Sequence, residues 1–211
     1  MTDLRLARGA DVRAEIEVRR SRFLTLLRRV DDEDAARALV ADARSRYPDA
    51  RHHCSAFVVD VAGANPVERS SDDGEPAGTA GMPMLEVLRG SGMSDVAAVV
   101  VRWFGGVKLG TGGLVRAYSD AVQAALDVAP VVRLERLDLW EVDLEHADAG
   151  RIEAELHGRG LTVQDVAYAA TGVRVTVATD DGDALVSLLA TLTSGAASPR
   201  RVGTTVVEHP R

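Results

Sequence analysis

The residues best suited to chemistry lie in one continuous segment, Arg102–Tyr118, with the sequence RWFGGVKLGTGGLVRAY. Five glycines fall within nine residues of this segment, and glycine lets a backbone take positive φ and approach a ligand closely. The segment also contains Arg102, Lys108 and Arg116, cations that suit phosphate or carboxylate groups. This combination predicts an anion-binding loop.

The second half of the segment has the period of a helix and would supply the anion site with backbone donors. We predict that Thr111 caps this helix and leaves the N–H groups of Gly112 and Gly113 free, at the positive end of the helix dipole. The spacing matches neither a Walker loop nor GxGxxG. A glycine-rich connection that only lets strand and helix pack tightly is the alternative. The candidate ligand-binding residues here are Arg102, Phe104, Gly105, Gly106, Lys108, Gly110, Thr111, Gly112, Gly113, Arg116 and Tyr118.

An acidic segment upstream, ERSSDDGEPAGTAGMP at residues 68–83, is a second candidate. Its three carboxylates after Ser71 could hold a divalent cation, but Asp-Gly and Glu-Pro are also ordinary turn chemistry, which we favour because no complete cation-loop spacing is present. Thr79 is predicted to cap the helix that follows. The candidate binding residues of this segment are Asp73, Gly74, Glu75 and Thr79.

The chain has one cysteine, Cys54, directly after His52 and His53. In a strand, His52 and Cys54 would share one face and His53 would point to the other, so at most two of the three could bind one metal ion. We favour a core thiol beside surface imidazoles and keep His53 as a candidate contact residue. No nucleophile and base can be paired, so we assign no catalytic residue, no metal ion and no cofactor.

The helices and strands that position these residues are predicted from hydrophobic periodicity and from the glycine and proline residues between them. A mixed α/β first half is expected, with a loop of about twenty residues from Gly63 to Gly81. Its predicted extended segments are 15–18, 22–30, 54–61 and 96–104, and its predicted helices lie within 31–48 and at 82–89 and 114–126. Residues 96–104 show no alternation, which indicates a strand buried on both faces.

The second half has the order strand, helix, strand, strand, helix, strand over about seventy residues, which is that of a split βαβ, ferredoxin-like unit. The strands are expected at 131–144, 161–169, 172–178 and 202–207, and the helices at 147–157 and 183–192. We therefore predict an α+β chain of two domains, residues 1–135 and 136–211.

Composition restricts the possible functions. With 32 acidic and 25 basic residues the chain has a formal net charge of −7, which argues against a surface that coats a polyanion and leaves room for a local basic site. Lys108 is the only lysine. The longest apolar run, residues 96–101, is too short for a membrane helix, and the N-terminus offers no signal peptide. We expect a cytoplasmic protein with no membrane partner; the sequence does not indicate its oligomeric state.

The glycine-rich segment resembles the signature of the IMPACT/YigZ family, Arg-aromatic-aromatic-Gly-Gly-x-Lys-Leu-Gly-x-Gly-Gly-Leu-x-Arg-Ala-Tyr. The stretch from Asp73 to Gly81 resembles the family's Asp-Gly-Glu-Pro-x-Gly-Thr-Ala-Gly motif. Ser21-Arg22-Phe23 and His53 to Phe57 resemble two further landmarks, although the histidine and cysteine are adjacent here rather than spaced. The resemblance covers roughly residues 15–128.

The resemblance implies a ribosomal S-five domain two-like fold for the first domain and a ferredoxin-like second domain, a pair similar to the last two domains of elongation factor G. It implies a non-enzymatic, translation-associated regulator that binds RNA, the ribosome or a translation-related protein. Two alternatives stay open: an enzyme or binding protein for a small phosphorylated or carboxylated metabolite, and a pure protein adaptor.

Overall fold

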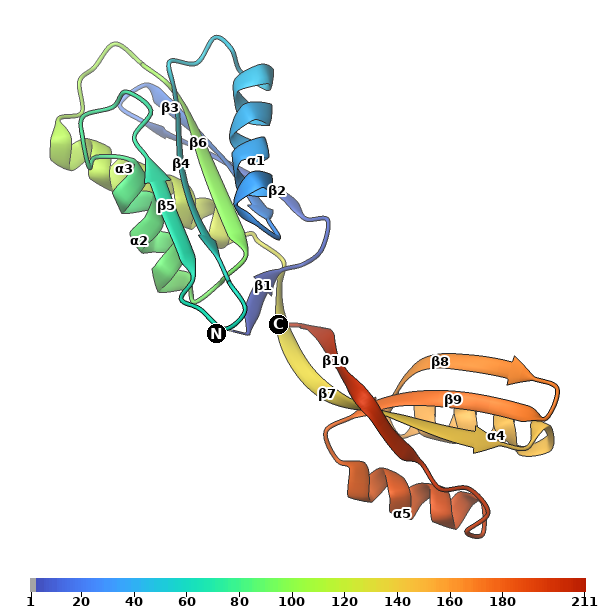
Figure 1. The fold of residues 1–211 in the computed structure, drawn as a ribbon. Helices are drawn as coiled ribbons and strands as arrows, with labels where there is room; N and C mark the ends of the chain where they lie inside the picture. The colour runs from blue at the N-terminus through green and yellow to red at the C-terminus, as the bar shows by residue number, and fades with distance from the viewer. Residues whose placement is uncertain (1–2) are drawn as a thin grey trace. The chain divides into compact units, whose positions relative to one another are not determined.

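The computed structural model describes residues 3–211; residues 1 and 2, where the predicted first domain begins, lie outside the described part. The chain forms two compact units (Figure 1). The first ends at Leu134 and also contains Glu208–Arg211, while the second is Glu135–Val207. The chain thus leaves the first unit, builds the second and returns for its last four residues, which the sequence did not indicate.

The first unit is a five-stranded sheet with helices on both faces (Figure 1). The sheet order is β2-β3-β6-β4-β5, and every neighbouring pair is antiparallel. The elements of this part of the chain are β1 (Leu4–Leu6), β2 (Asp11–Val18), β3 (Ser21–Arg29), α1 (Glu33–Arg46), β4 (His52–Val59), β5 (Val67–Ser71), α2 (Gly81–Ser91), β6 (Val96–Trp103) and α3 (Thr111–Leu126).

The central strand β6 contributes side chains to two hydrophobic clusters, one on each face of the sheet. Ala98 and Val100 pack into the cluster formed with α2 and α3, whereas Val99 and Val101 pack into the cluster formed with α1. All residues from Val96 to Val101 are buried. The predicted strand with two buried faces is confirmed, and the lack of alternation follows from helices covering both sides of the sheet.

The predicted twenty-residue loop is wrong in its middle. Residues 67–71 form β5, which pairs with β4 at the edge of the sheet, so the irregular stretch before α2 shrinks to residues 72–80. The sequence VERSS has no apolar alternation because an exposed edge strand buries little, and pairing with β4 rather than local propensity makes it a strand. We call residues 72–80 the acidic loop.

The second unit follows the predicted order of elements, and the chain as a whole has the predicted α+β class. The elements of this part of the chain are β7 (Val131–Leu144), α4 (His146–Gly158), β8 (Thr162–Ala169), β9 (Gly172–Thr179), α5 (Gly182–Leu192) and β10 (Arg200–Pro210). The start of β7 and the end of β10 belong to the first unit. Strand β7 pairs with both β9 and β10, and β9 pairs with β8. The helices cover this sheet through Ile152, Leu156, Leu185 and Leu189, which are fully buried.

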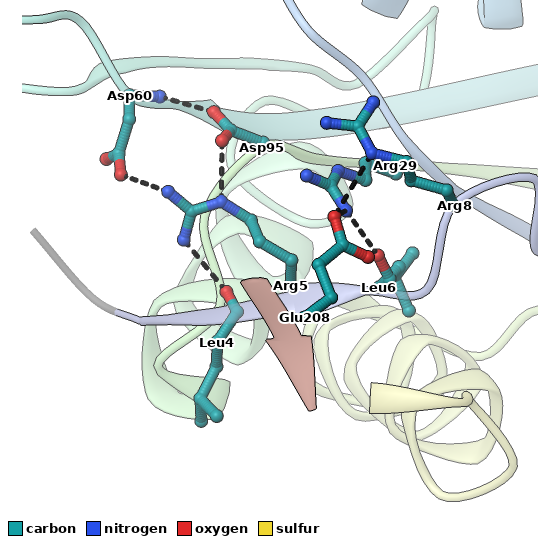
Figure 2. A network of polar contacts seen from close by, with 8 residues as sticks. All are labelled: Leu4, Arg5, Leu6, Arg8, Arg29, Asp60, Asp95 and Glu208. Atoms are coloured by element: carbon teal, nitrogen blue, oxygen red, sulfur yellow. Dashed lines mark hydrogen bonds and ion pairs between the residues drawn. The ribbon is translucent and has the colours of Figure 1, made fainter. Parts of the chain in front are cut away.

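Ion pairs connect β1 and the last residues of the chain to the rest of the first unit (Figure 2). The Arg5 guanidinium bridges Asp60 at 2.6 Å and Asp95 at 2.5 Å, with only 5% of the Arg5 side chain exposed. Glu208 accepts from Arg29 at 2.7 Å and from Arg8 at 3.1 Å. Strand β1 also pairs with the start of β7.

Candidate functional site

The acidic loop is held in place by its own first carboxylate. Asp72 accepts N–H groups of Ala80 at 2.9 Å, Gly81 at 2.8 Å and Gly78 at 2.7 Å. Burial opposes ionisation of Asp72, but these three donors together hold its pKa below the ordinary value. The N-terminus of α2 is therefore already occupied by an anion from the protein itself.

This arrangement corrects the predicted cap of α2. The N-cap residue is Ala80, and the Thr79 hydroxyl instead donates to the carbonyl of Pro76 at 2.7 Å. The prediction failed because Asp72, eight residues before Ala80, reaches across the loop to the helix end, and local spacing does not reveal such a contact.

Asp73 fastens the acidic loop to β4. It accepts the His53 backbone N–H at 2.6 Å and an Arg44 guanidinium N–H at 2.6 Å. Gly74 follows with φ of 84° and completes the turn. His53 is buried, with Nε2 at 3.0 Å from the Tyr47 carbonyl, so the expectation of a surface imidazole is wrong for His53. Asp73 and His53 serve internal contacts.

Glu75 lies at the centre of a buried polar chain. It accepts from Arg102 and, at 2.7 Å, from the Tyr118 hydroxyl. The Glu75 and Arg102 side chains are 5% and 7% exposed. The Cys54 thiol lies 3.3 Å from the Tyr118 oxygen, and burial raises the pKa of Cys54 to about 12. Burial likewise raises the pKa of Tyr118. The thiol belongs to the core, as predicted.

The glycines after β6 have different local requirements. Gly105 packs on the β2–β3 turn, where a Cβ would lie 2.0 Å from the Arg20 carbonyl carbon. Gly106 and Gly110 have φ of 86° and 72°. Gly113 would bring a Cβ within 3.1 Å of Leu109, whereas a Cβ on Gly112 would meet no atom within 4 Å. Gly112 differs from these four glycines, because neither close packing nor a positive φ requires glycine at this position.

Helix α3 begins without a side-chain cap. Its N-cap is Gly110, in a conformation that glycine favours, and Thr111 is the first helical residue, so the predicted Thr111 cap is wrong. The first turn contains no acidic residue. This helix end remains open to an anion, in contrast to the end of α2 that Asp72 occupies.

Part of the predicted site converges on a cavity of about 450 Å³, which we call the loop cavity. Six of its lining residues are among those predicted from the sequence: Glu75, Arg102, Phe104, Lys108, Gly110 and Thr111. The other lining residues, Arg51, His52, Pro76, Leu109 and Leu114, were not predicted and come from three parts of the chain. His52 rather than His53 faces the cavity.

The other predicted residues lie outside the loop cavity. Gly113 and Arg116 line a smaller neighbouring cavity of about 150 Å³ together with Arg19. Buried Tyr118, Thr79 and His53 act behind the surface through the contacts described above. Gly105, Gly106, Gly112, Asp73 and Gly74 shape the loops and do not line the loop cavity.

Five exposed cations surround residues 105–113, and we call them the loop cations: Arg19, Arg20, Arg51, Lys108 and Arg116. Arg51 and Lys108 line the loop cavity, Arg19 and Arg116 line the smaller one beside Asp120, and the Arg20 backbone touches Gly105. Within residues 3–211 none of the five forms an ion pair. Arg102, the cation buried beneath them, is neutralised by Glu75.

The described residues offer no cluster of three histidine, cysteine or acidic side chains that could hold a metal ion. Asp72, Asp73 and Glu75 turn to three different sets of partners, so the acidic loop is a structural turn there. In the same part of the chain, no helix is long and apolar enough to span a membrane.

Comparison with known proteins agrees with this architecture. The Impact N-terminal domain matches residues 19–126, and a domain of unknown function, DUF1949, matches residues 142–196. The chain is 45% identical over 148 residues to the IMPACT family member YigZ of Escherichia coli, covering 70% of this chain and 72% of that protein. It is 39% identical over 155 residues to YvyE of Bacillus subtilis, covering 73% and 70%.

A solved structure described as that of a hypothetical protein matches nearly the whole chain. The TM-score is 0.58 at 38% identity, with 96% of this chain and 98% of the other covered. The matched domains and the two curated relatives indicate the same family. The motifs from Arg102 to Tyr118 and from Asp73 to Gly81 are those of that family. The chain belongs to the IMPACT/YigZ family.

Proposed function

We propose that this protein is a translation-associated regulator that binds RNA through the surface formed by the loop cations. The observation that carries the proposal is the clustering of five exposed cations without ion pairs around residues 105–113 in a chain of net charge −7. The translation-related role itself rests on the family resemblance.

The charge pattern favours a local polyanion site over a general basic surface. Many exposed arginines elsewhere in the first unit are paired with neighbouring acids, as Arg37 is with Glu33 at 2.5 Å on α1. Such pairing removes a cation from competition for phosphate, whereas an unpaired cation can exchange its counterion for a phosphate group. Five cations imply few phosphate contacts and moderate affinity.

The open end of α3 adds uncharged donors to the same surface. Thr111, the first residue of this helix, lines the loop cavity together with Lys108, and Gly112 adds no side chain that would cover the N–H groups of the first turn. A phosphate placed there would meet the helix dipole and a flexible ammonium together. The buried Glu75 neutralises Arg102 and so confines the attraction to the rim.

Filter binding to transfer RNA and ribosomal RNA tests the proposal, with Lys108→Ala as the variant and Arg37→Ala as the control. The Arg37 side chain is also exposed, and its charge is already paired with Glu33 and Asp34. We expect Lys108→Ala to weaken binding roughly 2- to 12-fold, the equivalent of one hydrogen bond of about 0.5 to 1.5 kcal/mol. Weak retention that is insensitive to salt and identical for parent and Lys108→Ala would overturn the proposal.

A further inference from the structure

The loop cavity has apolar walls, which a site that binds only phosphate would not need. Its walls include Phe104, Leu109, Leu114 and Pro76, and its volume of about 450 Å³ falls within the range of about 300 to 1,000 Å³ typical of small-molecule sites. Phosphate alone needs an exposed cation and a donor, both of which the rim supplies. The apolar walls therefore point to a ligand with an apolar body.

Phe104 presents a ring that the protein leaves open. It is 49% exposed, and the Arg102 guanidinium lies 5.8 Å from its centroid. The preceding aromatic, Trp103, is instead packed by Tyr47 and covered by the Arg22 guanidinium at 4.6 Å. A half-exposed aromatic ring beside exposed cations can stack a nucleobase, because every base offers a π-face.

The buried Arg102–Glu75 pair lines the same cavity and keeps unused polar capacity. Arg102 Nε is buried and has no hydrogen-bond partner in the described part of the chain. Both side-chain bonds to Glu75 end on Oε1. Buried polar groups are normally satisfied, so an N–H without a partner, in a side chain that lines a cavity, is a candidate donor to a ligand. A donor beside a carboxylate acceptor suits the polar edge of a base.

We propose that the loop cavity binds one nucleoside phosphate. The base stacks on Phe104 with its polar edge toward Arg102 and Glu75, and the phosphate lies at the rim near Lys108, Arg51 and the open end of α3. Two sources share this chemistry: an unpaired residue of an RNA strand, in which case the inference rests on the proposed function, and a free mononucleotide.

A cavity of similar size, about 440 Å³, in the second unit lacks this combination. Its charged side chains include Asp143 and Arg174, which bind each other at 2.8 Å. The cations of the loop cavity rim have no such partners in residues 3–211.

Isothermal titration of the full chain tests the inference, with AMP, CMP, GMP and UMP, the matching nucleosides and inorganic phosphate as probes. At least one nucleotide should bind at least tenfold more tightly than its nucleoside and than inorganic phosphate. Phe104→Leu should weaken binding of that nucleotide at least fivefold, while Arg37→Met should leave the binding unchanged. Thermal melts of each variant verify folding. The half-exposed Phe104 ring should contribute little to stability. Nucleotides that bind no better than phosphate, or an unaffected folded Phe104→Leu variant, would overturn the inference.

RNA binding by the same proteins separates this inference from the proposed function. Arg116, on the neighbouring cavity, should contribute to RNA binding and not to nucleotide binding, so Arg116→Met should weaken only the former. RNA binding without any nucleotide binding would leave the proposed function standing and refute the nucleotide site. Nucleotide binding without RNA binding would support a free-nucleotide site and refute the proposed function.

Discussion

Gly105 and Gly112 stand in the same segment but differ in what a side chain would meet. Gly105→Ala would place a Cβ 2.0 Å from the Arg20 backbone, so we expect a loss of at least about 2 kcal/mol in unfolding free energy from overpacking. Gly112→Ala meets no atom within 4 Å and should stabilise α3 by up to about 1 kcal/mol. If Gly112 serves an anion, that variant should also bind RNA more weakly.

Urea denaturation and filter binding of the two variants check this pair. Equal stability effects at Gly105 and Gly112 would contradict the packing role of Gly105. Unchanged RNA binding by Gly112→Ala would remove Gly112 from the anion site.

Lys108 is the residue at which a conservative change is most informative. It is the only lysine among 25 basic residues, and it lies between two glycines with positive φ, Gly106 and Gly110, on the rim of the loop cavity. A compact ammonium and a planar guanidinium place their donors differently. We expect Lys108→Arg to weaken RNA binding by a measurable factor in filter assays, and full binding by this variant would show that only the charge matters.

Some residues of the site could be predicted from the sequence and others could not. Lys108, Phe104 and Gly110 could be predicted because the signature is continuous along the chain. The buried ion pair of Arg102 could not, since its partner Glu75 is 27 residues away in the sequence. Arg51 carries no local signal and joins the cavity only through the pairing of β4 with β6.

At the scale of elements, the end of α2 should make stability depend on acidic pH. The folded pKa of Asp72 lies below its ordinary value of 3.8, so the folded state binds fewer protons than the unfolded state. The contribution of ionised Asp72 is present above the unfolded pKa and is lost as the pH falls through the lower folded pKa. Asp72→Asn should cost about 1 kcal/mol at neutral pH, in the range of a lost helix cap.

Urea denaturation of parent and Asp72→Asn at about pH 7 and about pH 3 measures this contribution. Trp103 fluorescence in a Trp140→Phe background restricts the signal to the first unit. The difference between the two proteins should shrink at the lower pH. A constant difference would contradict the role of the carboxylate.

The short strand β1 depends on Arg5, whose guanidinium separates two carboxylates with side chains 10% and 21% exposed. Arg5→Met would leave Asp60 and Asp95 without this partner, and we expect a loss of about 3 kcal/mol. Arg8→Met is the control, because Arg8 is 71% exposed and its pair with Glu208 should contribute less than about 1 kcal/mol. Similar losses for the two variants, measured by the same fluorescence, would contradict a central role for Arg5.

Elements with a strong period were predictable and edge elements were not. Helix α3 and strand β6 carry their burial pattern in the sequence, through Leu114, Tyr118 and the run from Val96. Strands β1 and β5 are short and are made by their partners β7 and β4. No local propensity distinguishes such segments from loops.

At the scale of the whole molecule, acidity and anion binding are compatible because charge is distributed unevenly. Paired acids and bases cover much of the first unit, and the unpaired loop cations gather at residues 105–113. Composition alone showed the net charge of −7 and could not show which cations are paired. The βαββαβ order of the second unit was predictable, whereas the return of Glu208–Arg211 to the first unit depends on contacts with distant Arg8 and Arg29.

The salt dependence of RNA binding is the sharpest test of an RNA-binding surface formed by the loop cations. If up to five loop cations each replace counterions on single-stranded RNA, the plot of log K against log salt should have a slope of about −2 to −3.5. Lys108→Ala and Arg116→Ala should each reduce the magnitude of that slope by about 0.7, while Arg37→Ala should not. A slope near zero, or a slope unchanged by the removal of Lys108 and Arg116 together, would contradict RNA binding through the loop cations.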